Sequence, residues 1–182
     1  NMRQDVVAVI KCHTAVTMIT NDDEKYMQAA LKEAKKAYYE DEVPVGCVIV
    51  WNDKIIARGH NKRDEKKSIF AHAEMIALAK ASKKVNSWIL DECTVYITLE
   101  PCLMCSGALL QARVKRIVIG AMEPKHGACG SVIDVFQGYL FNHIPQIDKG
   151  CLSNASSELL KSFFKELRAK SQLQKKEKTN KN

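Results

Sequence analysis

Apolar and polar positions repeat along the chain with two different periods, and these periods divide it into helices and strands. Between residues 21 and 40, apolar side chains recur at three- and four-residue spacing behind the polar caps Asn21, Asp22 and Asp23, which predicts a helix. The continuous apolar run at 45–51 predicts a buried strand. Asn52-Asp53 then predicts a tight turn into a second strand at 55–59, so the two strands form a hairpin.

The remaining chain continues the alternation of helix and strand. Residues 66–69 have the composition of a loop, and the segments that follow have periodic apolar positions. The expected elements are a helix from His72 to about Lys84, a strand at 94–99, a helix from Cys102 to Ala112, a strand at 116–120, a short helix at 133–139, a weak strand at 146–148 and a final helix from Ser153. This order predicts an α/β protein with three layers, α/β/α, around a mixed five-stranded sheet.

The length of 182 residues suits one domain, which we expect at residues 21–170. Residues 1–20 form an N-terminal extension with no chemistry that the sequence assigns. Residues 171–182 are expected to be a disordered basic tail. The formal net charge of +7 is concentrated near the C-terminus, where a basic stretch at 161–170 shares a helix with Phe163-Phe164 and favours RNA binding. After Gln174, polyanion binding and a solvated tail are equally good interpretations.

The cysteines indicate a reducing compartment. Seven is an odd number, and the spacings are not those of a secreted disulfide framework. We see neither a secretory signal nor an apolar run of membrane-spanning length. The expected location is therefore the cytoplasm, or a reducing organelle, without a membrane partner. Four cysteines are expected to be reduced residues in or near the core: Cys47, Cys93, Cys129 and Cys151.

Two short motifs carry candidate chemistry: His72-Ala73-Glu74 and, about 30 residues later, Pro101-Cys102-Leu103-Met104-Cys105. One imidazole and two thiolates bind zinc and leave a fourth tetrahedral position for water, whereas a structural zinc site closes with a fourth side chain. Pro101 suits a helix start, which would place Cys102 in the first turn, with Cys105 on the same face. The helix dipole there favours the thiolate that binds metal.

His72 and Glu74 can serve one site only at a helix start. Residues two apart on a regular helix point about 200° away from each other. We therefore expect both at the beginning of their helix, with Glu74 beside the water position but not a ligand. Because two thiolates offset the charge of the zinc ion, a carboxylate is needed to move the proton. The alternative is a structural zinc site, or a thiol pair with a core histidine.

The arrangement H-x-E…P-C-x-x-C matches the signature of zinc-dependent nucleobase deaminases. Within the cytidine/deoxycytidylate deaminase superfamily, the chain resembles the bacterial tRNA adenosine deaminases from about Asp23 to Lys170. The shared segments are Glu-Val-Pro-Val-Gly at 42–46, Gly-His-Asn at 59–61, Ala-His-Ala-Glu-Met at 71–75, the stretch 98–108 around the cysteines, Pro-Lys at 124–125, 127–131, Phe-Asn-His at 141–143 and 163–168.

This resemblance implies a cytidine-deaminase-like fold and a set of residue roles. One Zn²⁺ per subunit would be bound by His72, Cys102 and Cys105, and Glu74 would be the catalytic proton shuttle. Asn61 would hydrogen-bond the flipped adenine, although a turn asparagine that closes the preceding strand is an equally simple interpretation. Positions that grip the anticodon stem-loop of a tRNA, expected to be an arginine tRNA, match Lys125, Asn142, Phe164 and Arg168.

Other features of the resemblance concern packing and assembly. The family forms homodimers in which RNA touches both subunits, so a homodimer is implied. Helix packing is the alternative role for Phe163 and Phe164, and we expect one of the two to be core. His60 and His143 are expected to be structural, and His126 a loop residue. The loop carries Glu123 where many relatives have aspartate, which alters any ribose contact there.

The leading functional hypothesis is hydrolytic deamination of adenosine to inosine at the wobble position, 34, of a tRNA. A deaminase of free bases or nucleosides, of the guanine or cytosine type, is the first alternative, and it would not need the basic helix at 163–170. The second alternative is a non-catalytic RNA-binding module stabilised by zinc, in which Glu74 has little purpose.

Overall fold

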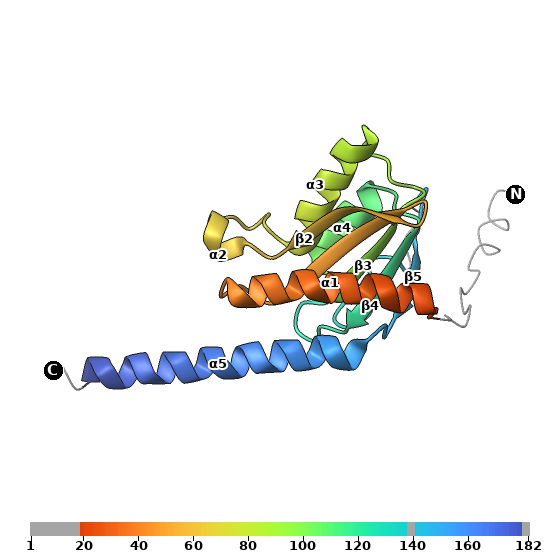
Figure 1. The fold of residues 1–182 in the computed structure, drawn as a ribbon. Helices are drawn as coiled ribbons and strands as arrows, with labels where there is room; N and C mark the ends of the chain where they lie inside the picture. The colour runs from red at the N-terminus through yellow and green to blue at the C-terminus, as the bar shows by residue number, and fades with distance from the viewer. Residues whose placement is uncertain (1–18, 138–140, 180–182) are drawn as a thin grey trace, which may run out of the picture.

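A computed structural model describes residues 19–137 and 141–179 of the chain. Five strands form one mixed sheet in the order β2-β1-β3-β4-β5 (Figure 1). Strand β1 (Gly46–Trp51) is antiparallel to β2 (Lys54–His60) and to β3 (Thr94–Leu99). Strands β4 (Arg116–Ala121) and β5 (Gln146–Lys149) run parallel to β3. The mixed five-stranded sheet predicted from the sequence is confirmed.

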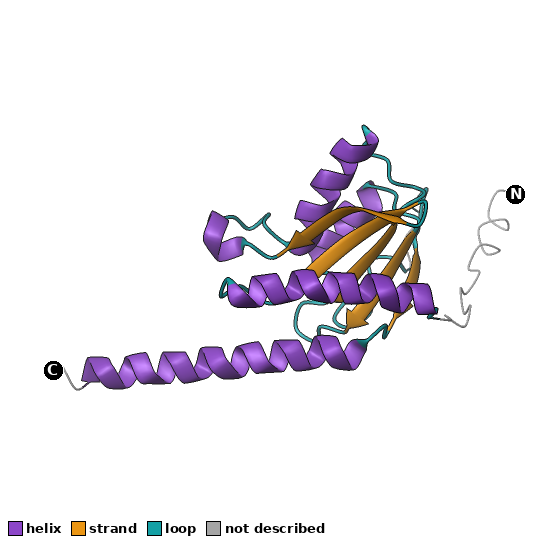
Figure 2. Cartoon of the chain, viewed as in Figure 1, coloured by secondary structure: helices purple, strands orange, loops and turns teal. Residues whose placement is uncertain are grey.

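Helices cover both faces of the sheet and give the expected three layers (Figure 2). On one face lie α1 (Asn21–Tyr39) and α5 (Ser153–Thr179), and on the other lie α3 (Ala73–Val85) and α4 (Leu103–Gln111). A single helical turn, α2 (Arg63–Lys66), precedes α3. The sequence predicted a loop at 66–69, so the helical turn overlaps this prediction only at Lys66. The start of α1 is capped by Thr20, whose hydroxyl accepts the Asp23 N–H while the Asp23 carboxylate accepts the Thr20 N–H.

Close approach of helices to the sheet depends on two glycines. A Cβ at Gly46 would lie 2.0 Å from the carbonyl oxygen of Ala30 in α1. A Cβ at Gly59 would lie 2.2 Å from the carbonyl oxygen of Ala73, the first residue of α3. No side chain fits at either distance, so both helices rest directly on the hairpin strands. The contact at Gly59 fixes the beginning of α3 against β2.

A buried ion cluster at the far end of the sheet joins four elements, α1, β3, β4 and β5. Arg116 donates to Asp23 of α1 at 2.6 Å and also pairs with Asp148 of β5, and Tyr96 donates its hydroxyl to Asp23 at 2.9 Å. Burial opposes ionisation of Asp23, but the hydrogen bonds from Arg116, Thr20 and Tyr96 together outweigh it and lower the pKa of the carboxyl to about 2. The cluster therefore stays charged at neutral pH and ties α1 to the ends of β4 and β5.

Two predictions about the C-terminal part are wrong for the described residues. A helix was expected at 133–139, but residues 133–137 form turns, because the Asp134 carboxylate accepts the Phe136 N–H at 3.0 Å and Asp134 bridges to Cys129. Residues 171–182 were expected to be disordered, whereas α5 continues to Thr179. The predicted extension at 1–20 falls almost wholly outside the described residues. Within the described ranges, no helix has the length and apolarity needed to cross a membrane.

Candidate metal centre and active site

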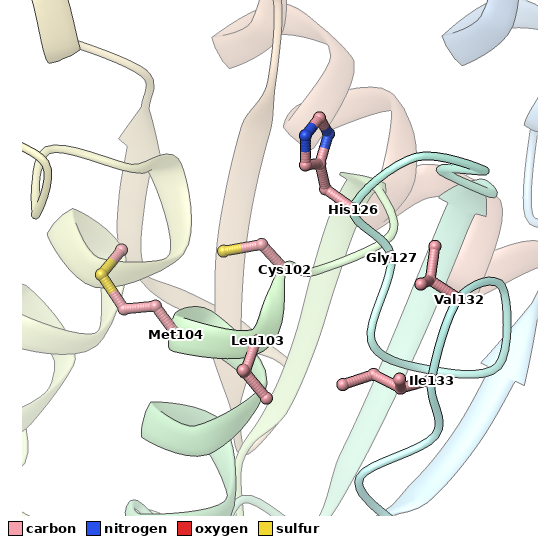
Figure 3. Close-up of a pocket in the computed structure, with 7 residues that line it drawn as sticks. All are labelled: Cys102, Leu103, Met104, His126, Gly127, Val132 and Ile133. Atoms are coloured by element: carbon pink, nitrogen blue, oxygen red, sulfur yellow. The ribbon is translucent and has the colours of Figure 1, made fainter.

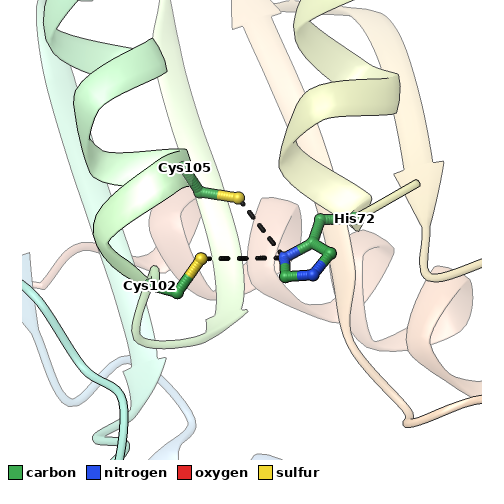
Figure 4. Close-up of side chains that lie close together, drawn as sticks. All are labelled: His72, Cys102 and Cys105. Atoms are coloured by element: carbon green, nitrogen blue, oxygen red, sulfur yellow. Dashed lines mark hydrogen bonds between the residues drawn. The ribbon is translucent and has the colours of Figure 1, made fainter. Parts of the chain in front are cut away.

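Three predicted metal ligands come together where two helices begin on the same face of the sheet. His72 is the N-cap of α3 and Cys102 is the N-cap of α4, and Cys105 lies in the first turn of α4. The Nδ1 atom of His72 lies 3.8 Å from Sγ of Cys102 and 3.5 Å from Sγ of Cys105 (Figure 4). Cys102 was expected one position later, inside the first turn, but its extended backbone still aims the thiol at His72.

The spacing of these three atoms fits a zinc ion. Tetrahedral zinc with Zn–N near 2.1 Å and Zn–S near 2.3 Å separates nitrogen from sulfur by about 3.6 Å. Both observed N–S distances, 3.5 and 3.8 Å, are close to that value. The ligand atoms all lie within 4.8 Å of one another, and they form the one group of three or more potential ligands found among the described residues. Two sulfurs and one imidazole are also the donors that zinc prefers.

Glu74 lies beside this cluster because His72 is outside the helix. His72 has an extended backbone, φ −80° and ψ 152°, whereas Glu74 is already helical. The side chains of His72 and Glu74 therefore do not point in opposite directions, as they would on a regular helix. This agrees with the prediction that both lie at a helix start. The Glu74 carboxylate is 3 % exposed and hydrogen-bonds the Cys105 thiol. Burial raises the pKa of Glu74 above its ordinary value.

The two thiols differ in acidity. A hydrogen bond from Cys105 is the largest cause that lowers the pKa of Cys102, to about 3, and His72 acts in the same direction. The pKa of Cys105 is raised, first by that same hydrogen bond to Cys102 and then by burial. One proton is thus shared within the thiol pair, and Cys102 is ready to bind a cation as thiolate.

Asn61 fixes the start of α3 from the end of β2. Its Oδ1 atom accepts the N–H of Ala73 at 2.9 Å, and the residue is 7 % exposed. This contact caps the helix that carries His72 and Glu74. Asn61 therefore has a structural role, because its side-chain oxygen caps α3. The side-chain amide nitrogen of Asn61 takes no part in this cap.

Glu100, which the sequence pattern did not single out, anchors the wall beside the cysteines. It is 3 % exposed and precedes Pro101-Cys102. Its carboxylate accepts hydrogen bonds from the backbone N–H groups of Glu123, Cys129 and Ser131, and from the Ser131 hydroxyl. A Cβ on Gly127 would lie 2.2 Å from this carboxylate, which explains the glycine. One buried side chain thus holds the loop 123–131 against the start of α4.

We expect Glu100→Gln to lower the free energy of unfolding by about 2–4 kcal/mol, because an amide NH₂ would face backbone donors that now share a carboxylate. The measurement is urea unfolding of the two proteins under identical conditions. Glu158→Gln is the matched control, since the Glu158 side chain is 69 % exposed and pairs only with Lys161 among the contacts described. Its effect should stay within about 0.5 kcal/mol. Equal effects of the two substitutions would contradict the anchoring role.

An open pocket of about 320 Å³ adjoins the metal-ligand cluster through Cys102 (Figure 3). Its floor comes from the first turn of α4, with Leu103 and Met104, and its wall from the loop that Glu100 anchors. That wall contains His126 and Gly127 of the loop, and Val132 and Ile133, which follow the loop directly, complete it. The pocket is mostly apolar.

The remaining predicted binding residues lie outside this cluster. Lys125 is exposed in the loop 123–131, where its backbone N–H donates to the Glu123 carboxylate, so that this carboxylate already has a partner. Asn142 is exposed on the segment before β5. Phe164 is 39 % exposed and Arg168 lies one turn further along α5. Phe163 is the core member of the aromatic pair, as expected, at 6 % exposed.

Among the described residues, most of the other histidines and cysteines have structural surroundings. His60 lies between the carboxylates of Glu33 and Glu40 at 3.2 and 3.1 Å, and His143 contacts the Val114 carbonyl at 2.7 Å. Both were expected to be structural. His126 is exposed in a turn, as expected. The four cysteines expected in or near the core are buried and free: Cys47, Cys93, Cys129 and Cys151.

The fold and the ligand geometry together define a class, the α/β/α deaminases that carry a His-Cys-Cys zinc-binding set. The family described as the cytidine and deoxycytidylate deaminase zinc-binding region matches residues 20–121, and the chain belongs to this family of hydrolytic deaminases. A tRNA-specific adenosine deaminase of Bacillus subtilis (strain 168) is 45 % identical over 148 residues, which are 81 % of this chain and 92 % of that protein. One of Aquifex aeolicus (strain VF5) is 42 % identical, over 80 % of this chain and 95 % of that protein.

Solved structures of deaminases have a similar fold. A structure from a study of A-to-I editing by tRNA:A34 deaminases superposes with a TM-score of 0.72 at 37 % identity, covering 75 % of this chain and 99 % of that one. A guanine deaminase from Nitrosomonas europaea superposes with a TM-score of 0.68 at 22 % identity, covering 81 % of this chain and 86 % of that one. The second likeness concerns the fold alone.

Proposed function

We propose that the protein is a tRNA adenosine deaminase that converts adenosine to inosine at the wobble position, 34, of an anticodon, with one Zn²⁺ in each subunit. The observation that carries the proposal is the buried Glu74 carboxylate beside the His72, Cys102 and Cys105 cluster. The relatives that share this family over four fifths of the chain are tRNA-specific adenosine deaminases.

The side chains divide the chemistry between them. His72 Nδ1 and the two thiolates would hold the zinc ion, which when bound makes water acidic enough to serve as the nucleophile at C6 of adenine. Glu74 would carry two protons in turn. The first passes from the attacking water to the ring nitrogen, and the second passes from the new hydroxyl on C6 to the amine, which leaves as ammonia. A carboxylate whose pKa is raised by burial suits a group that must both accept and donate a proton near neutral pH.

Binding of the base falls to Asn61 at the start of α3, and binding of the anticodon loop falls to residues outside the cluster. The Oδ1 atom of Asn61 is occupied by the Ala73 N–H, so its amide nitrogen is the group that would donate to a ring nitrogen of the flipped adenine. Phe164 offers an aromatic face to an unstacked base, with Arg168 nearby for phosphate. Lys125 and Asn142 are exposed on segments where they could contact the same anticodon stem-loop.

Assembly and location extend the proposal. A homodimer is supported by exposed apolar side chains around the pocket, where Leu103, Val132 and Ile133 are 59, 54 and 45 % exposed. Sedimentation equilibrium should then give twice the monomer mass, and a monomer at micromolar concentration would reject the homodimer. The cytoplasm is the proposed compartment, since the six described cysteines are free thiols and the substrate is a tRNA.

The direct experiment is incubation of zinc-loaded protein with an arginine-tRNA anticodon stem-loop, followed by digestion to nucleosides and mass spectrometry. We expect inosine to replace the adenosine at position 34 and no other adenosine. A stem-loop with guanosine at that position is the matched control and should remain unchanged. Zinc-loaded protein that forms no inosine, but releases ammonia from guanine or cytosine, would instead establish a free-base deaminase.

A further inference from the structure

We propose that the outer face of α5 is a continuous phosphate-binding surface, and that its projecting end reaches the tRNA backbone beyond the anticodon loop. This inference rests on the proposed tRNA substrate and adds a second contact region to it. The outer face is defined by Lys161, Lys165, Arg168 and Lys176, and the projecting end by residues 171–179.

One face of α5 is occupied by the body of the protein. Phe163 packs edge-on against Tyr38 with ring centroids 5.6 Å apart, and the Tyr38 hydroxyl donates to Glu166 at 2.6 Å. One turn later Lys170 donates to Asp41 at 2.7 Å, just past the end of α1. These three α5 residues recur at three- and four-residue spacing, so they share one side of the helix. Glu166 and Asp41, the acidic partners in these contacts, are therefore on the body side, whereas Glu158 lies on the outer face beside Lys161.

The basic residues of the outer face lie on the opposite side. At 100° per residue, the positions of Lys161, Lys165, Arg168 and Lys176 fall within an arc of about 80°, and the arc is centred roughly opposite Lys170. All four side chains are exposed. Lys161 shares its charge with Glu158 at 2.8 Å, at the beginning of the row. A row of cations on one side of a helix is the arrangement that follows a phosphate backbone.

The row continues past the body of the protein. Lys170 is tied to Asp41, and from there α5 runs on through residues 171–179, about 13 Å at 1.5 Å per residue (Figure 1). The described side chains of this end, at 171–174 and 176, are exposed, so packing stabilises the basic helix end poorly. A polyanion is the partner that would order and use it.

The projecting end leaves the protein at the edge of the sheet near α2, the helical turn that precedes the site. Asp41 is followed by Glu42, whose buried carboxylate accepts the N–H of Asp64 in α2 at 2.7 Å. The segment after α2 leads directly into His72. Figure 1 shows α5 extending beyond the end of α1 at the left of the view, the side on which α2 also lies. An RNA whose loop enters the site would therefore have its stem within reach of this helix.

The distribution of charge on α5 favours an RNA-binding helix over a helix that is only solvated. Between Lys161 and Thr179 the sequence has seven basic residues and two acidic ones, Glu166 and Glu177, in a chain of net charge +7. Glu166 is turned to Tyr38 on the body side. A solvated helix has no need to separate its charges by face, whereas a phosphate-binding helix requires this separation.

The test compares the full chain with a truncation after Lys170, which keeps the contacts of Phe163, Glu166 and Lys170. Binding and turnover are measured with full-length tRNA and with a short anticodon stem-loop, over a series of salt concentrations. We expect the truncation to raise KM for full-length tRNA about tenfold and to lower the slope of log Kd against log salt by about 1–2, at about 0.9 per phosphate contact. The rise should be smaller for the short stem-loop, which lacks the outer phosphates.

A pair of single substitutions separates a surface contact from a general effect of charge. Lys176→Gln on the outer face should raise Kd for full-length tRNA about threefold, whereas Lys170→Gln removes the same charge from the body side and should change it less than twofold. An unchanged Kd and salt slope for the truncation, or equal effects of the two substitutions, would overturn the inference. Failure of the full chain to form inosine in the short stem-loop would instead reject the proposed function, because that assay does not depend on the projecting end.

Discussion

Replacement of Glu74 by glutamine is expected to lower kcat for inosine formation by about a thousandfold and to leave the zinc content unchanged. The amide has the shape of the carboxylate but cannot accept a proton from water, and general acid–base catalysis contributes about 10²- to 10⁴-fold. Because Glu74 is outside the His72, Cys102 and Cys105 group, its replacement removes no ligand. KM should change little, since the lost interaction acts on the reacting proton.

The measurement combines single-turnover rates on the anticodon stem-loop with zinc determination by mass spectrometry. Glu33→Gln is the matched control, because Glu33 is likewise buried, at 4 % exposed, but contacts Lys36 and His60 away from the cluster. That variant should retain kcat within a few fold. A Glu74→Gln protein with normal zinc and nearly normal kcat would show that another group carries the proton.

The strands were predictable because their apolar runs are short and bounded by turn residues. The prediction for residues 94–99 coincides with β3, and those for β1, β4 and β5 agree within a residue or so at each end. The hairpin at Asn52-Asp53 followed from the turn dipeptide, and both residues have positive φ. Strands of this kind are determined locally, since burial on both faces selects a continuous apolar sequence.

The core of the site was predictable for a different reason. Coordination chemistry restricts which side chains bind zinc, and helix geometry restricts where His72 and Glu74 can both face one point. Together these constraints required His72 to be at a helix start, and it is the N-cap of α3. Cys102 could be displaced by one position without loss, because an N-cap and a first-turn residue present a thiol on the same side of the helix start.

The supporting residues were not predictable from local pattern. Glu100 contacts backbone groups that are 23 to 31 residues away in sequence, and Arg116 joins Asp23 across 93 residues. No periodicity encodes such contacts, since they depend on how loops and strand ends meet. The wrong helix at 133–139 has a local cause, because the Asp134 side chain offers the backbone a turn that an apolar pattern does not reveal. The basic composition after Lys170 likewise suggested disorder, although α5 continues through it.

Cys105→Ala is expected to weaken zinc binding by more than about a hundredfold and to abolish turnover at micromolar zinc. Loss of a residue that only orients a ligand already costs about 10- to 100-fold in affinity, and loss of a ligand costs more. His72 and Cys102 would remain as two ligands, too few for a closed tetrahedral set with one water. Thermal stability should fall with the metal, because a site that binds only the folded chain stabilises that chain.

Cys129→Ala is the control that distinguishes loss of a metal ligand from loss of a buried thiol. Cys105 and Cys129 are both fully buried, but Cys129 contacts the Ser106 hydroxyl at 3.5 Å and lies outside the ligand group. Both substitutions remove the same sulfur from the interior, so the cost of the small cavity is common to the two variants. Zinc affinity, measured by competition with a chromophoric chelator, should be lost only in Cys105→Ala. Stoichiometric zinc in that variant would mean that the metal is held by other side chains, and equal loss in Cys129→Ala would trace the effect to packing around α4.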